Sequence, residues 1–185
     1  RPDKADKSRL TIASIDIGGG TTDLVITDYS LDDGKGDNVY IKPEQCFRDG
    51  FKIAGDDILL AVIRLFVLPA VNDALLKAGV EKPEPLLSKL IGSEPLTVQE
   101  AVLRQQLTLQ VFSPIGLCLL KAYETYDPLE PSSLVSATFG ELLGNEQPTA
   151  DVLDYFSAAV RRQLGNGAGG FDLLQIPLNV SLRRI

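Results

Sequence analysis

Three consecutive glycines between two apolar stretches constrain this sequence more than any other feature. Gly18, Gly19 and Gly20 lie in the middle of the segment from Leu10 to Tyr29, and β-branched residues are frequent on both sides of them. Such residues favour extended strands, whereas glycines favour a turn. The segment therefore predicts a strand, a glycine turn and a second strand.

Polar residues around the turn indicate what it could bind. An ordinary hairpin needs one or two glycines, so a third indicates that something approaches the backbone closely. A turn without side chains exposes successive N–H groups that form a nest for an anion such as phosphate, and Thr21 and Thr22 add hydroxyl donors. Asp16 and Asp23 flank the turn, and carboxylates beside phosphate require a cation such as Mg²⁺. The alternative is a glycine-rich hairpin with two surface aspartates.

The absence of histidine excludes several kinds of site. A zinc site of cysteines and histidines cannot form, and a Cys–His or Ser–His catalytic pair would need a base from another chain. Cys46 and Cys118 are far apart in the sequence and form no C-x-x-C motif. Two reduced thiols of this kind are typical of a cytoplasmic protein.

Charge and hydropathy bear on the partners. The net charge is −7, and residues 122–160 contain seven acidic residues but no Lys or Arg. Such a surface repels nucleic acid, and it is either a solvated face or a surface for a protein partner. The longest apolar run, Ile58 to Val71, is interrupted by Arg64 and Pro69, so neither a signal peptide nor a membrane span is predicted.

The chain divides into four expected segments. Residues 1–9 are charged and aperiodic, which predicts a disordered lead-in. Residues 10–80 are expected to form the core of an α/β lobe, residues 81–170 a mostly helical inserted subdomain, and residues 171–185 a strand and the truncated start of a helix. Because the sequence contains no methionine, even at its start, we expect a piece of a larger protein.

The first segment continues beyond the glycine turn with a strand and a helix. Residues 39–47 predict a third strand, antiparallel to residues 24–29, and Pro43 indicates an edge position. A helix is expected from Asp56 to Lys77, with Asp56 and Asp57 capping its start. Pro69 predicts a kink, and Gly79 is placed to end the helix.

The later segments give weaker signals. Residues 81–95 predict a connector, and Thr97 with Glu100 has the spacing of a capping box. Residues 134–143 fit a strand or a helix equally, and Thr149 begins a further helix. Residues 165–170 fit G-x-G-x-x-G, but this motif follows a helix instead of a strand, so we expect a flexible loop and no dinucleotide site.

Two stretches resemble a known superfamily. Asp16-Ile-Gly-Gly-Gly-Thr-Thr-Asp23 is similar to the second phosphate motif of actins, DnaK-type chaperones and sugar kinases, and Ala54-Gly-Asp-Asp57 is similar to the turn before their following helix. The resemblance implies a ribonuclease H-like α/β ATPase lobe with a mixed sheet and flanking helices. Within that superfamily, the stretch from Phe47 to Ile58 resembles SrfB-type virulence factors of bacteria, whereas residues 81–165 match no pattern we recognise.

The resemblance implies a role for each residue of the turn. Asp16 would hold Mg²⁺, and Asp23 would position the metal or the attacking water, so both carboxylates are candidate catalytic and metal-binding residues. The N–H groups of Gly18, Gly19 and Gly20 would bind the β- and γ-phosphates of ATP, with hydroxyl contacts from Thr21 and Thr22. The first phosphate loop and the adenosine motif of the superfamily are missing from this sequence. The chain would therefore form one wall of the nucleotide site, and the other lobe of the same polypeptide would form the second wall. We expect the piece alone to bind nucleotide weakly and not to hydrolyse it.

Three other functions stay open. Exopolyphosphatases have a similar glycine motif, but Ser-Thr-Glu follows their glycines where this sequence has Thr21-Thr-Asp23. A non-catalytic interaction module could retain the fold and use the acidic helical segment to bind a protein. Filament formation, known among actin-like proteins, depends on surface features that the sequence does not specify.

Overall fold

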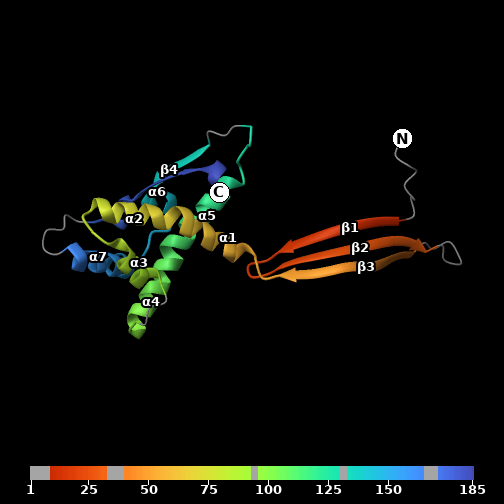
Figure 1. The fold of residues 1–185 in the computed structure, drawn as a ribbon, viewed down its shortest axis with the longest axis horizontal. Helices are drawn as coiled ribbons and strands as arrows, with labels where there is room; N and C mark the ends of the chain where they lie inside the picture. The colour runs from red at the N-terminus through yellow and green to blue at the C-terminus, as the bar shows by residue number, and fades with distance from the viewer. Residues whose placement is uncertain (1–8, 33–39, 93–95, 130–132, 165–170) are drawn as a thin grey trace. The chain divides into compact units, whose positions relative to one another are not determined.

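The computed structural model describes residues 9–32, 40–92, 96–129, 133–164 and 171–185 (Figure 1). Contacts divide the chain into two compact units, Arg1–Ile58 and Leu59–Ile185, and each is described by itself below. The expected boundary lay at residue 80. The observed one lies inside a helix, because residues from Val62 onward bury their apolar side chains in the helical core.

The first unit is built on a three-stranded antiparallel sheet with the order β1-β2-β3. Its strands are β1 (Arg9–Ile17), β2 (Thr22–Asp32) and β3 (Tyr40–Phe51), so the predicted strand–turn–strand and the antiparallel third strand are confirmed. Pro43 lies on an edge strand, as predicted, and edge strands are where a sheet tolerates proline.

Both ends of this sheet differ from the sequence-based expectation. Arg9 was expected in a disordered lead-in but begins β1, while residues 1–8 lie outside the described part of the chain. The strand β3 continues four residues beyond Phe47, because Phe51 pairs with Thr22 and Gly50 with Asp23. The ladder shifts between Ile26 and Thr27, which leaves Cys46 as the extra residue of a β-bulge.

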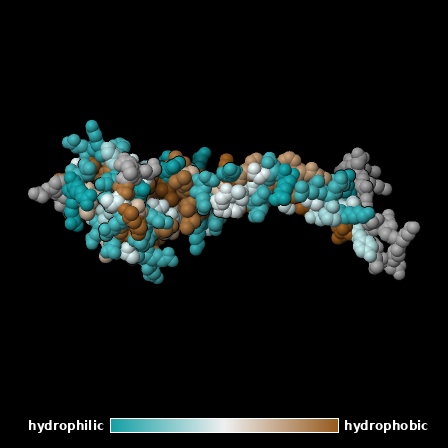
Figure 2. All heavy atoms as spheres, turned by 90° about the horizontal axis from the view of Figure 1, so that it is seen from below, coloured by the Kyte–Doolittle hydropathy of each residue, from teal (hydrophilic) through white to brown (hydrophobic). Residues whose placement is uncertain are grey.

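The sheet carries apolar side chains that its own unit does not cover. Besides the strands, the described part of this unit contains only the beginning of one helix. Ile15 is 67% exposed and Ile41 66%, and hydrophobic atoms are visible among hydrophilic ones on the surface of the strands (Figure 2). Strands with apolar residues on both faces are typical of a sheet that is covered on both sides in its functional state.

The second unit is mostly helical. Its described helices, together with the helix that crosses the unit boundary, are α1 (Gly55–Val62), η1 (Ile63–Val67), α2 (Leu68–Lys77), α3 (Pro83–Ile91), α4 (Val98–Leu107), η2 (Thr108–Phe112), α5 (Ser113–Tyr123), α6 (Phe139–Leu143), α7 (Ala150–Leu164), η4 (Leu173–Gln175) and η5 (Leu182–Arg184). The largest side chains of its core, Phe112, Phe139 and Phe156, are fully buried. This core explains why the helices that precede residue 80 belong to this unit.

Two long helices pass through a π-helical segment just before a proline. The segment η1 precedes Pro69 in α2, and η2 precedes Pro114 in α5. A proline inside an α-helix removes one hydrogen bond and clashes with the carbonyl four residues earlier, and a π-turn relieves both problems. The predicted kink at Pro69 is therefore a real irregularity, and Pro114 follows a second one, but both helices continue.

Gly79 ends α2 as predicted. Its φ of +98° lies in the left-handed region, where glycine is favoured. Its N–H donates to Leu76 O at 3.0 Å, and the N–H of Val80 donates to Leu75 O at 3.0 Å. These are the two bonds of a Schellman motif, and the burial of Val80 and Leu75 supplies its hydrophobic contact.

Several expectations for the later segments need correction. The expected connector contains α3, because a proline at the first helical position is favourable and Leu86 and Leu90 are buried. The ambiguous residues 134–143 form a strand, β4 (Leu134–Thr138), followed directly by α6. The Thr97–Glu100 capping box and the helix after Thr149 are confirmed. Residues 165–170 lie outside the described part of the chain.

The second sheet bears on the fold class. The strand β5 (Pro177–Ser181) pairs with β4 in a separate two-stranded antiparallel sheet. A mixed sheet was expected, but both sheets of the described residues are antiparallel. The chain is thus a mixed α/β protein with a small antiparallel sheet and a set of helices.

One helical stretch has the length and composition of a membrane span. Among the described residues, Gly55–Lys77 has 23 residues, and an 18-residue window within it has a mean hydropathy of 2.0. Core helices of globular proteins pass the same test, and Val67, Val71 and Leu75 of this stretch are fully buried in the helical core. This observation is weak evidence for a membrane segment, and the predicted absence of one stays a prediction.

Candidate functional site

The glycine turn connects β1 to β2 through Gly18, Gly19, Gly20 and Thr21. The N–H of Gly18 donates to Thr21 O at 2.8 Å and closes the turn. Among the described residues only Gly79 and Gly144 have positive φ, so left-handed backbone is not the reason for the triplet. Space is the reason at Gly18, where an added Cβ would lie 3.3 Å from Thr21 O.

Three successive backbone N–H groups of the turn are free. Within the described part of the chain, the N–H groups of Gly19, Gly20 and Thr21 make no hydrogen bond. All three residues are exposed, and a Cβ on Gly20 would meet no atom within 4 Å. Consecutive free N–H groups with open space before them are the elements of an anion-binding nest. Gly18 was predicted to contribute as well, but its N–H is already bonded inside the turn.

The start of α1 fixes the position of the turn. The N–H of Gly55 donates to Gly18 O at 3.0 Å, and the N–H of Asp56 donates to Gly19 O at 2.9 Å. A Cβ on Gly55 would lie 3.3 Å from Gly18 O, so a glycine at this position permits the close approach. The turn is therefore held by two backbone bonds even without a ligand.

The two threonines of the turn differ in their contacts. The hydroxyl of Thr22 donates to Ile53 O at 2.6 Å, so its proton is committed to the segment that leads into α1. The side chain of Thr21 makes no hydrogen bond among the described residues and is exposed. Of the two predicted hydroxyl donors, Thr21 is the one that is free to meet a ligand.

Asp16 and Asp23 come together on one face of the sheet. They are direct cross-strand partners in the β1–β2 ladder, one pair further from the turn than Ile17 and Thr22. Asp23 is also opposite Gly50 in β3, and a Cβ on Gly50 would lie 3.4 Å from Asp23 Oδ1. Two like charges in opposite positions destabilise a sheet unless a cation or another partner offsets them.

The donor set of this pair fits Mg²⁺. Among the described residues, no group of three or more acidic or cysteine side chains lies close enough to hold a metal ion by itself. Mg²⁺ is usually held by one or two carboxylates, with waters and phosphate oxygens completing its octahedron. Two carboxylates beside free backbone N–H groups are compatible with that requirement, whereas a site for calcium would need more protein oxygens.

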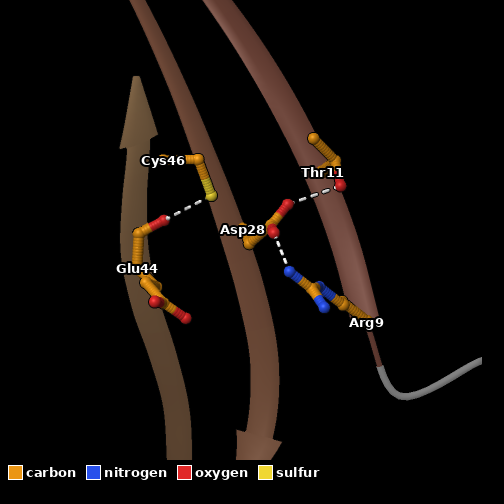
Figure 3. A network of polar contacts seen from close by, with 5 residues as sticks. All are labelled: Arg9, Thr11, Asp28, Glu44 and Cys46. Atoms are coloured by element: carbon orange, nitrogen blue, oxygen red, sulfur yellow. Dashed lines mark hydrogen bonds and ion pairs between the residues drawn. The ribbon is translucent and has the colours of Figure 1, made fainter. Parts of the chain in front are cut away.

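A polar network on the first sheet was missed by sequence reasoning. Asp28 is the one buried charged residue of the described chain, and it accepts a hydrogen bond from Thr11 Oγ1 at 2.5 Å and pairs with Arg9 (Figure 3). Cys46, in the β-bulge, lies beside it and donates to Glu44 O at 3.5 Å. An aspartate inside a predicted strand was the available signal, because strands are depleted in this residue.

This network shifts two pKa values in opposite directions. The hydrogen bond from Thr11 and then that from Arg9 lower the pKa of Asp28 to about 2. The carboxylate of Asp28, followed by desolvation, raises the pKa of the Cys46 thiol. A thiol with a raised pKa is a poor nucleophile, so Cys46 is not a candidate catalytic residue.

The hollows of the helical unit are separate from the turn residues. One groove, of about 360 Å³, is lined by residues of η1, α2, β5 and η5, among them Phe66, Asp73 and Arg184. No residue of the glycine turn lines it. The chemistry-bearing residues thus lie in an open turn and not in an enclosed cavity.

Fold and turn together define a class: an α/β protein in which an antiparallel sheet presents a glycine turn with free N–H groups beside two carboxylates. Within that class the chain belongs to the virulence factor SrfB family, whose family model matches residues 1–185. The resemblance of the stretch from Phe47 to Ile58 to SrfB-type proteins is therefore confirmed. No curated protein and no solved structure matches the chain.

Proposed function

We propose that the turn from Asp16 to Asp23 binds the β- and γ-phosphates of Mg-ATP, as one wall of the nucleotide site of an actin-like ATPase. The observation that carries this proposal is the run of three free N–H groups, from Gly19 to Thr21, beside an opposed pair of carboxylates. The fold would be a ribonuclease H-like lobe, and the second wall would come from the other lobe of the same polypeptide.

Complementary charge explains why Mg-nucleotide is the ligand class. The N–H groups provide donors for phosphate oxygens, but Asp16 and Asp23 would repel a bare phosphate. A magnesium ion between carboxylate and phosphate turns both repulsions into attractions. Neither half of the site is sufficient alone, which favours a ligand that brings phosphate and metal together.

Each residue has a separate role in this proposal. Asp16 holds the metal, directly or through water, and Asp23 orients the metal or the attacking water. Gly19, Gly20 and Thr21 bind phosphate oxygens through their N–H groups, and Thr21 can add its hydroxyl. Phosphoryl transfer depends mainly on positioning and charge neutralisation, and these groups supply part of both. Hydrolysis requires the groups of the other lobe, so the piece alone binds weakly and the complete protein acts in the cytoplasm.

Two features of the chain support this assignment. The strand β3 runs through Ala54-Gly-Asp-Asp57 into a helix, and this is the connection that the resemblance to actin-like ATPases implies. The turn also lies between β1 and β2 with its phosphate-facing groups already positioned by α1. Preorganised donors reduce the cost of binding, because they need no further ordering.

The test is calorimetric titration of the full-length protein with ATP in the presence of Mg²⁺, beside an Asp16→Ala variant. We expect Mg²⁺-dependent binding that weakens by about tenfold or more in the variant, because the metal loses a direct or water-mediated ligand. Asp49→Ala is the matched control, because Asp49 is an exposed aspartate of the same sheet. Gly50 is opposite Asp23 and shares its face, so the preceding residue, Asp49, lies on the other face. Absence of binding in a folded parent would overturn the proposal and favour an interaction module.

A further inference from the structure

Two neighbouring aspartates at the start of α1 have different surroundings. Both were expected to cap the helix, but only Asp57 makes a capping bond among the described residues, as its Oδ2 accepts the N–H of Ala54 at 3.1 Å. A Cβ built on Gly19 would lie 3.6 and 3.7 Å from the two carboxylate oxygens of Asp56. The carboxylate of Asp56 therefore lies against the turn.

The helix end gives no donors that could offset this charge. The N–H groups of Gly55 and Asp56 are bonded to Gly18 O and Gly19 O, so they cannot also bind a phosphate. The same two bonds hold Asp56 in place beside Gly19, because the residue is attached to the turn through its own backbone. Gly19 also carries one of the free N–H groups, so an anion in the nest would lie close to this carboxylate.

We propose that Asp56 is a specificity-determining residue that excludes metal-free phosphates from the glycine turn. This inference rests on the proposed function, because it concerns the same site. A free nucleotide or inorganic phosphate meets the negative charge of Asp56 next to the N–H of Gly19. A magnesium-bound nucleotide carries less negative charge, and its metal would be held by Asp16 and Asp23. Asp56 thus makes metal loading a condition for binding without being a metal ligand itself.

The experiment compares the affinity of the full-length protein for ATP with Mg²⁺ and with a chelator in its place. The Asp56→Asn variant keeps the size of the side chain and removes its charge. We expect its affinity for metal-free ATP to rise about fivefold, the factor that a like charge at about 4 Å produces even in water. Its affinity for Mg-ATP should stay within about twofold of the parent.

Asp57→Asn is the matched control, because it removes the same charge one residue later on the same helix. Since the carboxylate of Asp57 is directed to the N–H of Ala54, this variant should not gain affinity for metal-free ATP. An equal gain in affinity for metal-free ATP in both variants would show that the effect comes from net charge alone, and it would overturn the inference. If Asp56→Asn matches the parent under both conditions, the inference fails while the proposed function stands. If the parent binds neither form of ATP, the proposed function fails, and this inference fails with it.

Discussion

At the scale of single residues, the same side-chain type acts differently according to its neighbours. Asp16 and Asp23 face each other beside the turn, Asp57 caps a helix, and Asp28 is buried against Arg9 and Thr11. The sequence was sufficient to find Asp16 and Asp23, because they flank the glycines at a recognisable spacing. It could not find the Arg9–Asp28 pair, because that contact depends on the register of β1 against β2, which brings together residues nineteen positions apart.

The low pKa of Asp28 gives a prediction about acid stability. A carboxyl group whose folded pKa is about 2, below its ordinary value of 3.8, stabilises the fold above pH 3.8 and loses that contribution as the pH falls towards 2. We expect the midpoint of urea unfolding of the 185-residue chain to fall over this window in the parent. In an Asp28→Asn variant, the decrease of the urea midpoint that is due to Asp28 should be absent. At pH 7 this variant should be less stable than the parent. Equal stability of parent and variant at pH 7 would show that the network contributes nothing.

At the scale of elements, local signals predicted starts and ends better than interiors. The capping box at Thr97, the stop at Gly79 and the edge position of Pro43 are all present, because each depends on contacts within a few residues. The helix α3 was taken for a connector, since its two prolines outweighed the apolar spacing of Leu86 and Leu90. The π-helical segment before Pro69 could be predicted only as a kink, because packing in the helical core decides how the helix continues.

The Schellman motif at Gly79 gives a prediction about the stability of the helical unit. A Gly79→Ala variant places a Cβ on left-handed backbone, which should lower the free energy of unfolding by about 1 kcal/mol. Urea unfolding followed by circular dichroism measures this change. Gly20→Ala is the control, because that glycine has no positive φ and an added Cβ meets open space. A loss at Gly20 as large as that at Gly79 would contradict the conformational explanation.

At the scale of the whole molecule, the fold class could be predicted but the division into units could not. The sequence indicated an α/β chain with a helical second part, which the structure confirms in coarse form. It placed the boundary after residue 80, whereas η1 and α2 share the core of the later helices. Apart from Ala54, every buried apolar residue of the described chain lies between Leu59 and Ile185. Long-range packing of this kind has no signature in local periodicity.

This distribution of the core gives a prediction about fragments. A fragment of residues 55–185 should remain helical and unfold cooperatively, because it contains nearly the whole core. A fragment of residues 1–54 should show no cooperative unfolding, since a three-stranded sheet with uncovered faces has too little buried surface. Circular dichroism during heating distinguishes the two. Cooperative unfolding of the sheet fragment alone would contradict the account of where stability resides.

The central claim is that the free N–H groups of the glycine turn bind the phosphates of a magnesium nucleotide. The most direct measurement is a titration of the isotopically labelled 185-residue chain with Mg-ATP, followed through backbone amide resonances in NMR, which detects the weak binding expected of one wall of a site. We predict that the amides of Gly19, Gly20 and Thr21 shift together and more than that of Gly18, whose N–H is bonded to Thr21 O. Shifts confined to other parts of the chain, or none at millimolar nucleotide, would contradict the claim.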